Sequence, residues 1–502
     1  MALKTTDIDR IFDTCIDPFG KGLITDQTVY YYCTSPFMVY CERFVPEDKK
    51  DPLTAYQKMV FEQSEIHRQC VIEKKYGRSK TVEYKTVEYR SQENGFKKLL
   101  EGMSEGVDVL CRLPAFYIPE NLKGTFDILE KCTAEKSKFG GYHYVLKKII
   151  SAKEVKDHHK CQGAFLNYLL GKIQGYTPPI FYLIDRDYNE VPIGYRYCKN
   201  RLRTMLRRIR KIFDGKEITP IYGCKYPWET YSREKAIETH DVSLVCGIGQ
   251  SKKGNLAKVK IKTVEDLVQA NIGTITGIKG IGQKTAKEYS QKAKVLIDKN
   301  HICLNPYNFP KRKTEIFLDF EYMDEQLYFD EPVSINYLIG VVTRTSGKIE
   351  YKPFIAHQLD EEGEMFDQFV EWLLEHERSV IYHWSTPEKK RLEDLLDEYR
   401  FSEETRERVR RIIRENMIDL CKITTKSCVF PTYGDGLKEI GNYIGYEWKH
   451  ADVDARECTA LYFQYIENPR KHKAELQKIL DYNEDDCRAT IHIKDWLEEN
   501  IP

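Results

Sequence analysis

Residues 316–322 read IFLDFEY, an apolar segment that carries two acidic residues, Asp319 and Glu321. Its aromatic and β-branched residues predict a buried strand. Because successive side chains of a strand point to opposite faces, both carboxylates lie on one face and the flanking apolar residues on the other. Two carboxylates on one face repel each other unless a cation lies between them, so the pair indicates a site for Mg²⁺ or Mn²⁺. A solvated edge strand is the alternative interpretation.

A second acidic motif, DYNEDDCRAT at residues 481–490, follows near the end of the sequence. Tyr482 and Asp486 are four residues apart, so a helix brings them to one face, where they can contact a common ligand. A tyrosine one turn before a carboxylate can orient a water that metal ions activate. The order of the two motifs resembles the tyrosine-type exonucleases of the ribonuclease-H-like superfamily, and in particular the YprB-type ribonuclease-H-like domain.

This resemblance implies a further acid after a middle strand, and residues 379–392, SVIYHWSTPEKKRL, offer Glu388. The superfamily more often has aspartate there, preceded by asparagine, whereas this chain has His383 and Glu388. Asp419 is the competing residue, although it matches better a structural aspartate of the superfamily, and His383 is either a ligand or a packed histidine. The expected metal site and its nucleophile-orienting tyrosine comprise Asp319, Glu321, Glu388, Asp486 and Tyr482.

The middle of the chain contains an internal repeat, CGIGQSKKGNL from Cys246 and KGIGQKTAKEY from Lys279. A Gly-X-Gly turn before a helix exposes backbone N–H groups where the helix dipole is positive, which suits a phosphate oxygen. The two copies resemble tandem helix-hairpin-helix modules, which implies DNA binding without sequence reading through Gly247, Gly249, Gly280, Gly282 and Lys284. Lys252 and Lys253 stand behind the first turn, but residues 251–254 make that copy the poorer helix. Two tight turns needed for packing are the alternative.

Several segments before residue 235 resemble, in order, the RecB-like PD-(D/E)XK nucleases, and most closely their CRISPR-associated exonuclease branch. They are YYYCTSPFMVYCERF, FEQSEIHRQC, GTFDILEK, YHYVLKKI and QGAFLNYLL. The resemblance implies a weaker metal site of His67, Asp127 and Lys148, followed by Gln162 and Tyr168.

The same resemblance exposes a missing acid, because the family has a carboxylate two residues before the lysine and this chain has Leu146. Leucine cannot hold a cation, so we expect a degenerate domain that binds or supports rather than cleaves, with Glu154 as the alternative acid. Relatives of this branch often hold an iron–sulfur cluster. Only Cys33 and Cys224 fit its positions, with Cys41 as a substitute, and we expect no cluster.

The full order predicts an α/β multidomain protein similar to a family of RecB-like nucleases. We expect a restriction-endonuclease-like α/β domain over 1–235, a small all-α helix-hairpin-helix region over 236–300, a linker over 301–313 and a ribonuclease-H-like α/β domain over 314–502. The implied function is a metal-dependent DNA exonuclease acting 3′ to 5′ with a DEDD-type two-metal site. A non-catalytic nucleic-acid-binding scaffold and an RNA-processing nuclease are the alternatives.

Composition is compatible with this function and excludes some others. The 502 residues carry 78 Lys+Arg and 78 Asp+Glu, so any nucleic-acid binding depends on local basic patches. No segment has the roughly 20 apolar residues of a membrane span, and the first residues lack the basic and apolar regions of a secretion signal. We therefore expect a cytoplasmic protein that does not contact membranes. The 15 scattered cysteines predict mostly reduced thiols.

Overall fold

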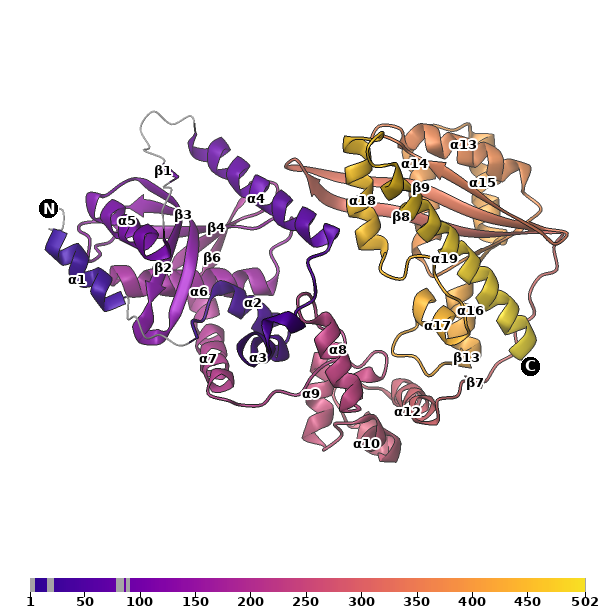
Figure 1. Ribbon diagram of the computed structural model, residues 1–502, viewed down its shortest axis with the longest axis horizontal. Coiled ribbons are helices and arrows are strands. Elements are labelled where there is room, and N and C mark those ends of the chain that lie inside the picture. The colour runs from indigo at the N-terminus through magenta and orange to yellow at the C-terminus, as the bar shows by residue number, and fades with distance from the viewer. Residues whose placement is uncertain (1–4, 16–21, 78–84, 87–90, 502) are drawn as a thin grey trace. The chain divides into compact units, whose positions relative to one another are not determined.

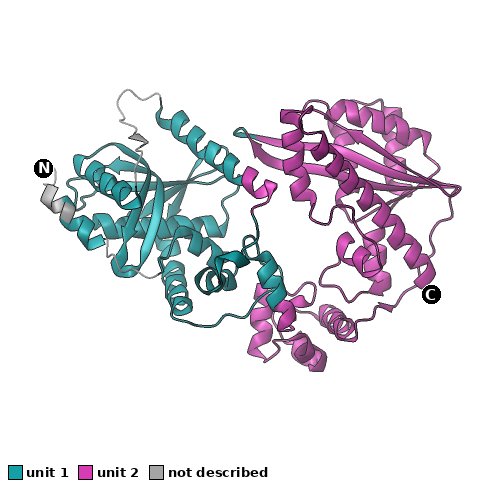
Figure 2. Cartoon of the chain, in the orientation of Figure 1, with its two compact units in different colours: residues 1–52, 60–235, 329–331 teal, residues 53–59, 236–328, 332–502 magenta. Residues whose placement is uncertain are grey.

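The computed structural model describes residues 5–15, 22–77, 85–86 and 91–501. The chain divides into two compact units, shown in Figure 2. Unit 1 comprises residues 1–52, 60–235 and 329–331, and unit 2 comprises residues 53–59, 236–328 and 332–502. Within the described ranges, every helix is too short or too polar to span a membrane.

Unit 1 is built on a mixed six-stranded sheet with the order β1-β2-β3-β4-β5-β6. Strands β1/β2 and β4/β5 pair in parallel, and the other neighbours are antiparallel. The strands are β1 (Lys85–Thr86), β2 (Val109–Tyr117), β3 (Leu122–Cys132), β4 (His143–Ile149), β5 (Ile180–Ile184) and β6 (Glu190–Gly194).

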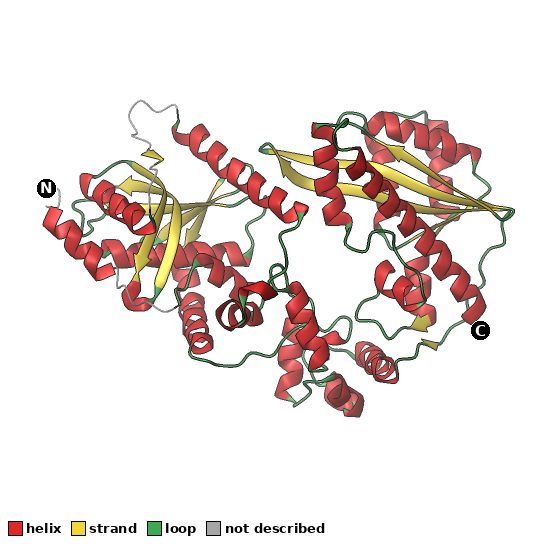
Figure 3. Cartoon of the chain, in the orientation of Figure 1, coloured by secondary structure: helices red, strands yellow, loops and turns green. Residues whose placement is uncertain are grey.

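Helices cover both faces of this sheet, as Figure 3 shows. On one face, Val71 and Ile72 of α4 pack against Ile128 of β3. On the other, α6 packs against β2 to β5 and fills the larger core. The helices are α1 (Thr5–Cys15), α2 (Asp26–Thr34), α3 (Pro36–Phe44), α4 (Ala55–Tyr76), α5 (Gln92–Glu105), α6 (Asp157–Gln174), α7 (Tyr195–Phe213) and α8 (Glu229–Glu238), with single 3-10 turns at Glu47–Lys49 and Ile118–Glu120.

Unit 2 begins with short helices that form two helical hairpins. Thr263 caps α10, and its hydroxyl and the Asp266 carboxylate bond each other's backbone N–H groups. The 3-10 turn Val242–Leu244 and helices α9 (Gln250–Lys258), α10 (Val264–Gln269), α11 (Ile272–Thr276) and α12 (Gln283–Asp298) make up this part.

The rest of unit 2 is built on a five-stranded sheet with the order β10-β9-β8-β11-β12. Strands β8, β11 and β12 run parallel, whereas β10 is antiparallel to β9. The strands are β8 (Thr314–Tyr328), β9 (Glu331–Thr345), β10 (Lys348–Ile355), β11 (Val380–His383) and β12 (Met417–Asp419). The IFLDFEY segment lies within β8, as its pattern predicts.

The two faces of β8 contact different helices. Phe317 packs against Tyr382 in a core that includes Cys487 and Ile491 of α19, which crosses the sheet (Figure 1). Phe320, on the opposite face, contacts Phe369 of α13. The helices are α13 (Glu362–Glu375), α14 (Pro387–Glu398), α15 (Glu403–Glu415), α16 (Leu420–Ser427), α17 (Leu437–Tyr443), α18 (Ala455–Glu467) and α19 (Lys473–Asn500).

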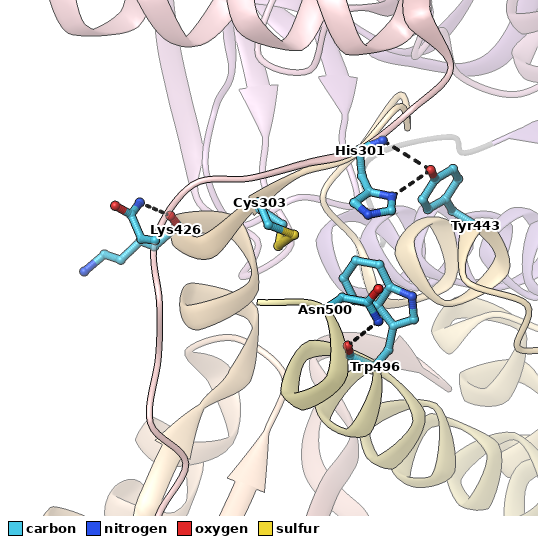
Figure 4. Close-up of a disulfide and its surroundings, with 8 residues drawn as sticks. His301, Cys303, Lys426, Tyr443, Trp496 and Asn500 are labelled. Carbon is cyan, nitrogen blue, oxygen red and sulfur yellow. Dashed lines mark hydrogen bonds between the residues drawn. A yellow bond between two sulfur atoms is a disulfide. The ribbon is translucent and has the colours of Figure 1, made fainter. Parts of the chain in front are cut away.

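The segment predicted as a linker contains a short strand. Strand β7 (Ile302–Cys303) pairs with β13 (Cys428–Val429), and Cys303 forms a disulfide with Cys428 (Figure 4). The expectation of mostly reduced thiols did not include this pair. The disulfide and the strand pair fix the first residues after α12 to the end of α16.

Candidate functional site

Three carboxylates converge in unit 2, two from β8 and one from α19. Oxygen atoms of Asp319, Glu321 and Asp486 all lie within 4.8 Å of one another. The Glu321 and Asp486 side chains are buried, and Asp319 is half-buried. The strand brings its two acids to one face, and the helix that crosses this face supplies the third. Two sequence motifs some 160 residues apart thus meet at one point.

The charge of this cluster is poorly compensated. Burial, followed by the charges of Glu321, Asp486 and Glu388, raises the pKa of Asp319 well above its usual value. Burial and the charge of Asp486 do the same to the pKa of Glu321. Burial also raises the pKa of Asp486 to about 6, although Trp448, Lys438 and Tyr482 act against it. Buried carboxylates that resist ionisation together are the donor set that a Mg²⁺ or Mn²⁺ ion stabilises, so the residues fit such an ion.

The cluster is held by side chains that sequence reasoning missed. Asn483 donates to Asp319 Oδ2 at 2.8 Å and accepts from the Tyr351 hydroxyl at 2.9 Å. Asn483 can reach this position because residue 340 is glycine, since a Cβ there would lie 1.5 Å from Asn483 Oδ1. Trp448 Nε1 donates to Asp486 Oδ1 at 2.7 Å. Asn483 stands inside the quoted motif, but no local signal links Trp448 to it.

Tyr482 lies one helical turn before Asp486, as its spacing predicts. The two side chains hydrogen-bond, and burial together with the charge of Asp486 raises the pKa of Tyr482. Lys438 Nζ lies 4.9 Å from the centre of the Tyr482 ring. Tyr482 is therefore a neutral hydroxyl at neutral pH, in direct contact with one carboxylate of the cluster.

Glu388 lies near this cluster but outside its 4.8 Å set. It is in the first turn of α14, and its charge contributes to the raised pKa of Asp319. His383 Nδ1 lies 3.4 Å from Glu388 Oε2, and both side chains are buried. Asp419, the competing residue, caps α16 by accepting from the Lys422 N–H at 2.9 Å. Burial raises the pKa of Glu388, and the charge of Asp419 adds to this, so both acids lie at this edge of the sheet.

The two hairpins differ in how they use their lysines. In the second, Gly280 has a φ of +87°, Gly282 caps α12, and the Lys284 side chain is 92% exposed. In the first, Lys253 is buried against Asp241 at 2.6 Å, and Lys252 Nζ donates to Gly247 O at 3.0 Å. The poor propensity of residues 251–254 does not prevent α9 from forming, because these contacts support it.

Of the residues predicted for an N-terminal metal site, Asp127 and Lys148 lie next to each other. Among the described residues, only the cluster of Asp319, Glu321 and Asp486 has three or more ligand atoms so close together. Lys148 Nζ lies 3.3 Å from Asp26 Oδ2 and 4.0 Å from Asp127 Oδ2, and the latter oxygen accepts from the Ile149 N–H. Leu146 is fully buried.

The remaining residues of that prediction differ in their surroundings. His67 is fully buried on α4, whereas Glu154 is exposed in the loop after β4. Gln162 donates to the Asp26 carbonyl at 3.2 Å, and the Tyr168 hydroxyl donates to Glu120.

The cysteines named for an iron–sulfur cluster have different neighbours. A hydrogen bond between the Cys33 and Cys161 thiols lowers the pKa of Cys161 to about 7. Cys224 lies near Cys41, whose pKa is raised, mainly by burial.

Comparisons with known proteins agree with the geometry of unit 2. Residues 316–498 match the family model of the RNase_H superfamily. The chain therefore carries an RNase_H-superfamily domain. Residues 242–288 match the family model of the SAM-like helix-hairpin-helix tandem. No curated protein matches the chain. The two domains indicate a nuclease-like protein that binds nucleic acid, and the RecB-like resemblance of the N-terminal third stays a prediction.

Proposed function

We propose that this protein is a divalent-metal-dependent nuclease, a DNA exonuclease with 3′ to 5′ polarity. One observation carries the proposal: three carboxylates, two buried and one half-buried, meet at one point with too little positive charge to compensate them. A protein that only binds nucleic acid gains nothing from this repulsion, whereas a cation site depends on it. The same observation argues against a non-catalytic scaffold.

The carboxylates of Asp319, Glu321 and Asp486 would hold Mg²⁺ or Mn²⁺, with Glu388 as the fourth acid of a DEDD-type site. The bound ions would supply a water-derived nucleophile and stabilise charge on the phosphate. Asn483 orients Asp319, and Trp448 orients Asp486, so that both keep their positions when the substrate enters. Tyr482, neutral and one turn from Asp486, can hydrogen-bond the attacking water.

We assign nucleic-acid binding to the helical hairpins, and mainly to the second. The backbone N–H groups after Gly280 and Gly282 would hold a phosphate, since space beside both glycines is open. Gly247 and Gly249 would do the same in the first hairpin, with less help from lysine. This grip reads no bases, so it suits an enzyme that acts on strands of any sequence.

The N-terminal unit is assigned a supporting role. Lys148 is paired with Asp26 and Asp127, and Leu146 has the position at which a nuclease of this type carries a metal-binding acid. This arrangement favours a degenerate nuclease domain over a second active site.

The test is cleavage by the full chain of end-labelled single-stranded and double-stranded DNA and RNA with Mg²⁺ or Mn²⁺. We expect metal-dependent release of nucleotides from 3′ ends of DNA, lost in Asp319→Asn and Asp486→Asn. Glu499→Gln is the matched control, because Glu499 is an exposed acid of the same helix α19. Equal cleavage by the parent and both site variants would rule out this assignment.

A further inference from the structure

A groove of about 1140 Å³ lies in unit 2 between helix α12 and one edge of the sheet. Its lining comes from α12, from residues 304–307 after the disulfide, from the ends of β11 and β12, and from α16. Neither the three clustered carboxylates nor the glycines of the hairpin turns are among its lining residues.

Lysines dominate the charged lining of this groove. It contains five lysines, Lys284, Lys292, Lys389, Lys422 and Lys426, against the three carboxylates Glu288, Asp419 and Asp435. Lys292 is paired with Asp435 at 2.7 Å. Lys389, Lys422 and Lys426 make no ion pair with any residue that the structure describes. Because the whole chain has no net charge, this is a local excess of positive charge of the kind that phosphates recognise.

The groove also has an apolar side. Leu304 is 46% exposed, and Pro306 and Tyr307 follow it in the lining. This segment is held in place, because the Leu304 N–H donates to Ser427 O at 2.7 Å and Asn305 donates to Lys426 O at 2.6 Å. Figure 4 shows the Lys426 side chain extending away from the disulfide. A fixed apolar and aromatic segment next to lysines offers surface to bases as well as to phosphates.

The groove adjoins both parts of the proposed nuclease. At one end, Lys284 lies two residues after Gly282, the cap of α12. At the other, His383 lies 3.4 Å from Glu388, whose charge reaches Asp319. A strand bound along the groove would therefore contact the second hairpin and pass His383, the neighbour of Glu388.

We propose that this groove binds a single nucleic-acid strand and guides its end from the second hairpin to the carboxylates. The proposal rests on the nuclease function. It specifies an unpaired strand, because the bases of a duplex are stacked on each other and cannot lie against Leu304 and Tyr307. Phosphates would be contacted by Lys389, Lys422 and Lys426.

The test is binding by the full chain in EDTA, measured by fluorescence anisotropy with a labelled single strand of about twelve nucleotides. DNA and RNA versions and the matching duplex are the other arms. The test variant is Lys422→Glu with Lys426→Glu, two exposed lysines one turn apart on α16. The control is Lys348→Glu with Lys390→Glu, which changes the net charge equally at exposed lysines outside the groove.

We expect the α16 variant to lose at least about tenfold in affinity for the single strand and the control to lose less than about twofold. Its logarithmic salt slope should fall by about 1.4, the value for two lost contacts to a single strand. Equal losses in both variants, or an α16 variant that loses as much affinity for the duplex as for the single strand, would overturn the proposal.

Failure of the nuclease function gives a different pattern. If the parent does not cleave, but the α16 variant binds the single strand more weakly than the parent, the groove proposal stands and the active-site assignment is wrong. If the parent cleaves and the α16 variant binds the single strand as tightly as the parent, the active-site assignment stands and the groove proposal is wrong.

Discussion

Buried and half-buried carboxylates gather in two regions of this molecule, and the two regions have opposite electrostatics. In unit 1, Asp26 and Asp127 lie on either side of Lys148, and Asp127 also accepts a backbone N–H. In unit 2, Asp319, Glu321 and Asp486 lie within 4.8 Å of one another, and Lys438 only partly offsets their repulsion. The negative charge of the carboxylates is neutralised by the protein in the first region and remains uncompensated in the second.

The contrast distinguishes an acid that stabilises a fold from an acid that binds a cation. Burial lowers the pKa of Lys148, but the charges of Asp26 and Asp127 outweigh this effect and raise it. Burial raises the pKa of both Asp319 and Glu321. The charges of Glu321 and Asp486 raise the pKa of Asp319 further, and the charge of Asp486 does the same for Glu321. Removing a charge should therefore destabilise the first region and relieve the second.

The largest expected difference is in catalysis. Asp319→Asn should lower metal-dependent DNA cleavage by at least about 10²-fold, because a carboxylate that holds the cation becomes a weak ligand. Asp127→Asn should leave cleavage nearly unchanged, since its carboxylate serves Lys148 and a backbone N–H. Single-turnover rates of both variants with Mn²⁺ measure this. Residual cleavage in Asp319→Asn that disappears when Asp127 is also replaced would indicate a live N-terminal site, with Glu154 as its first candidate acid.

The next difference is in stability. Lys148→Met should lower the free energy of unfolding of unit 1 by about 3 kcal/mol, because Asp26 would lose its cation and Asp127 would keep only Arg68, at 3.8 Å. Adding Asp26→Asn should recover part of the loss. Urea denaturation followed by fluorescence measures both variants. A Lys148→Met protein as stable as the parent would show that the lysine contributes nothing to this region.

In unit 2 the sign of the effect should reverse and depend on pH. The pKa of Asp486 is raised to about 6, so its protonated form favours the fold and its ionised form opposes it. Without metal, Asp486→Asn should match the parent near pH 4 and become more stable as the pH rises through 6, by about 2 to 3 kcal/mol.

Melting curves in EDTA from pH 4 to 8 measure this difference between the two proteins. Mg²⁺ or Mn²⁺ should remove the advantage of the variant, because the ion stabilises the parent. A variant that is less stable than the parent at pH 8 in EDTA would contradict the assignment of uncompensated charge.

The sequence predicts much of the carboxylate cluster because its acids follow short periods. Alternation along IFLDFEY places Asp319 and Glu321 on one face, and the four-residue spacing places Tyr482 beside Asp486. The cap at Thr263 likewise depends on a near neighbour, Asp266, three residues later. These features depend on residues within one or two turns of each other.

Contacts between distant segments could not be predicted in this way. Trp448 reaches Asp486 from a loop, and Cys303 pairs with Cys428 at a separation of 125 residues. The sequence also does not show whether a lysine side chain is buried or exposed, since Lys253 pairs with the buried Asp241 while Lys284 is exposed. The strand order of the sheet, which places Glu388 near Asp319, also depends on tertiary packing.

The smallest expected difference compares the two hairpins with a single methyl group. Gly249 and Gly282 both precede a helix, both have a φ of −82°, and an added Cβ would have no neighbour within 4 Å at either. Alanine is therefore tolerated equally by the fold, and a difference in binding reports phosphate contact alone.

Gly282→Ala should weaken binding of single-stranded DNA in EDTA by about threefold to tenfold, since the methyl group stands where a phosphate approaches a turn with an exposed lysine. Gly249→Ala should change it by less than about twofold, because Lys252 and Lys253 already bond within the protein. The loss in Gly282→Ala should be the same for unrelated sequences, as a backbone grip carries no base information. Equal losses at both glycines would show that the hairpins share the phosphates, and a larger loss at Gly249 would reverse the assignment.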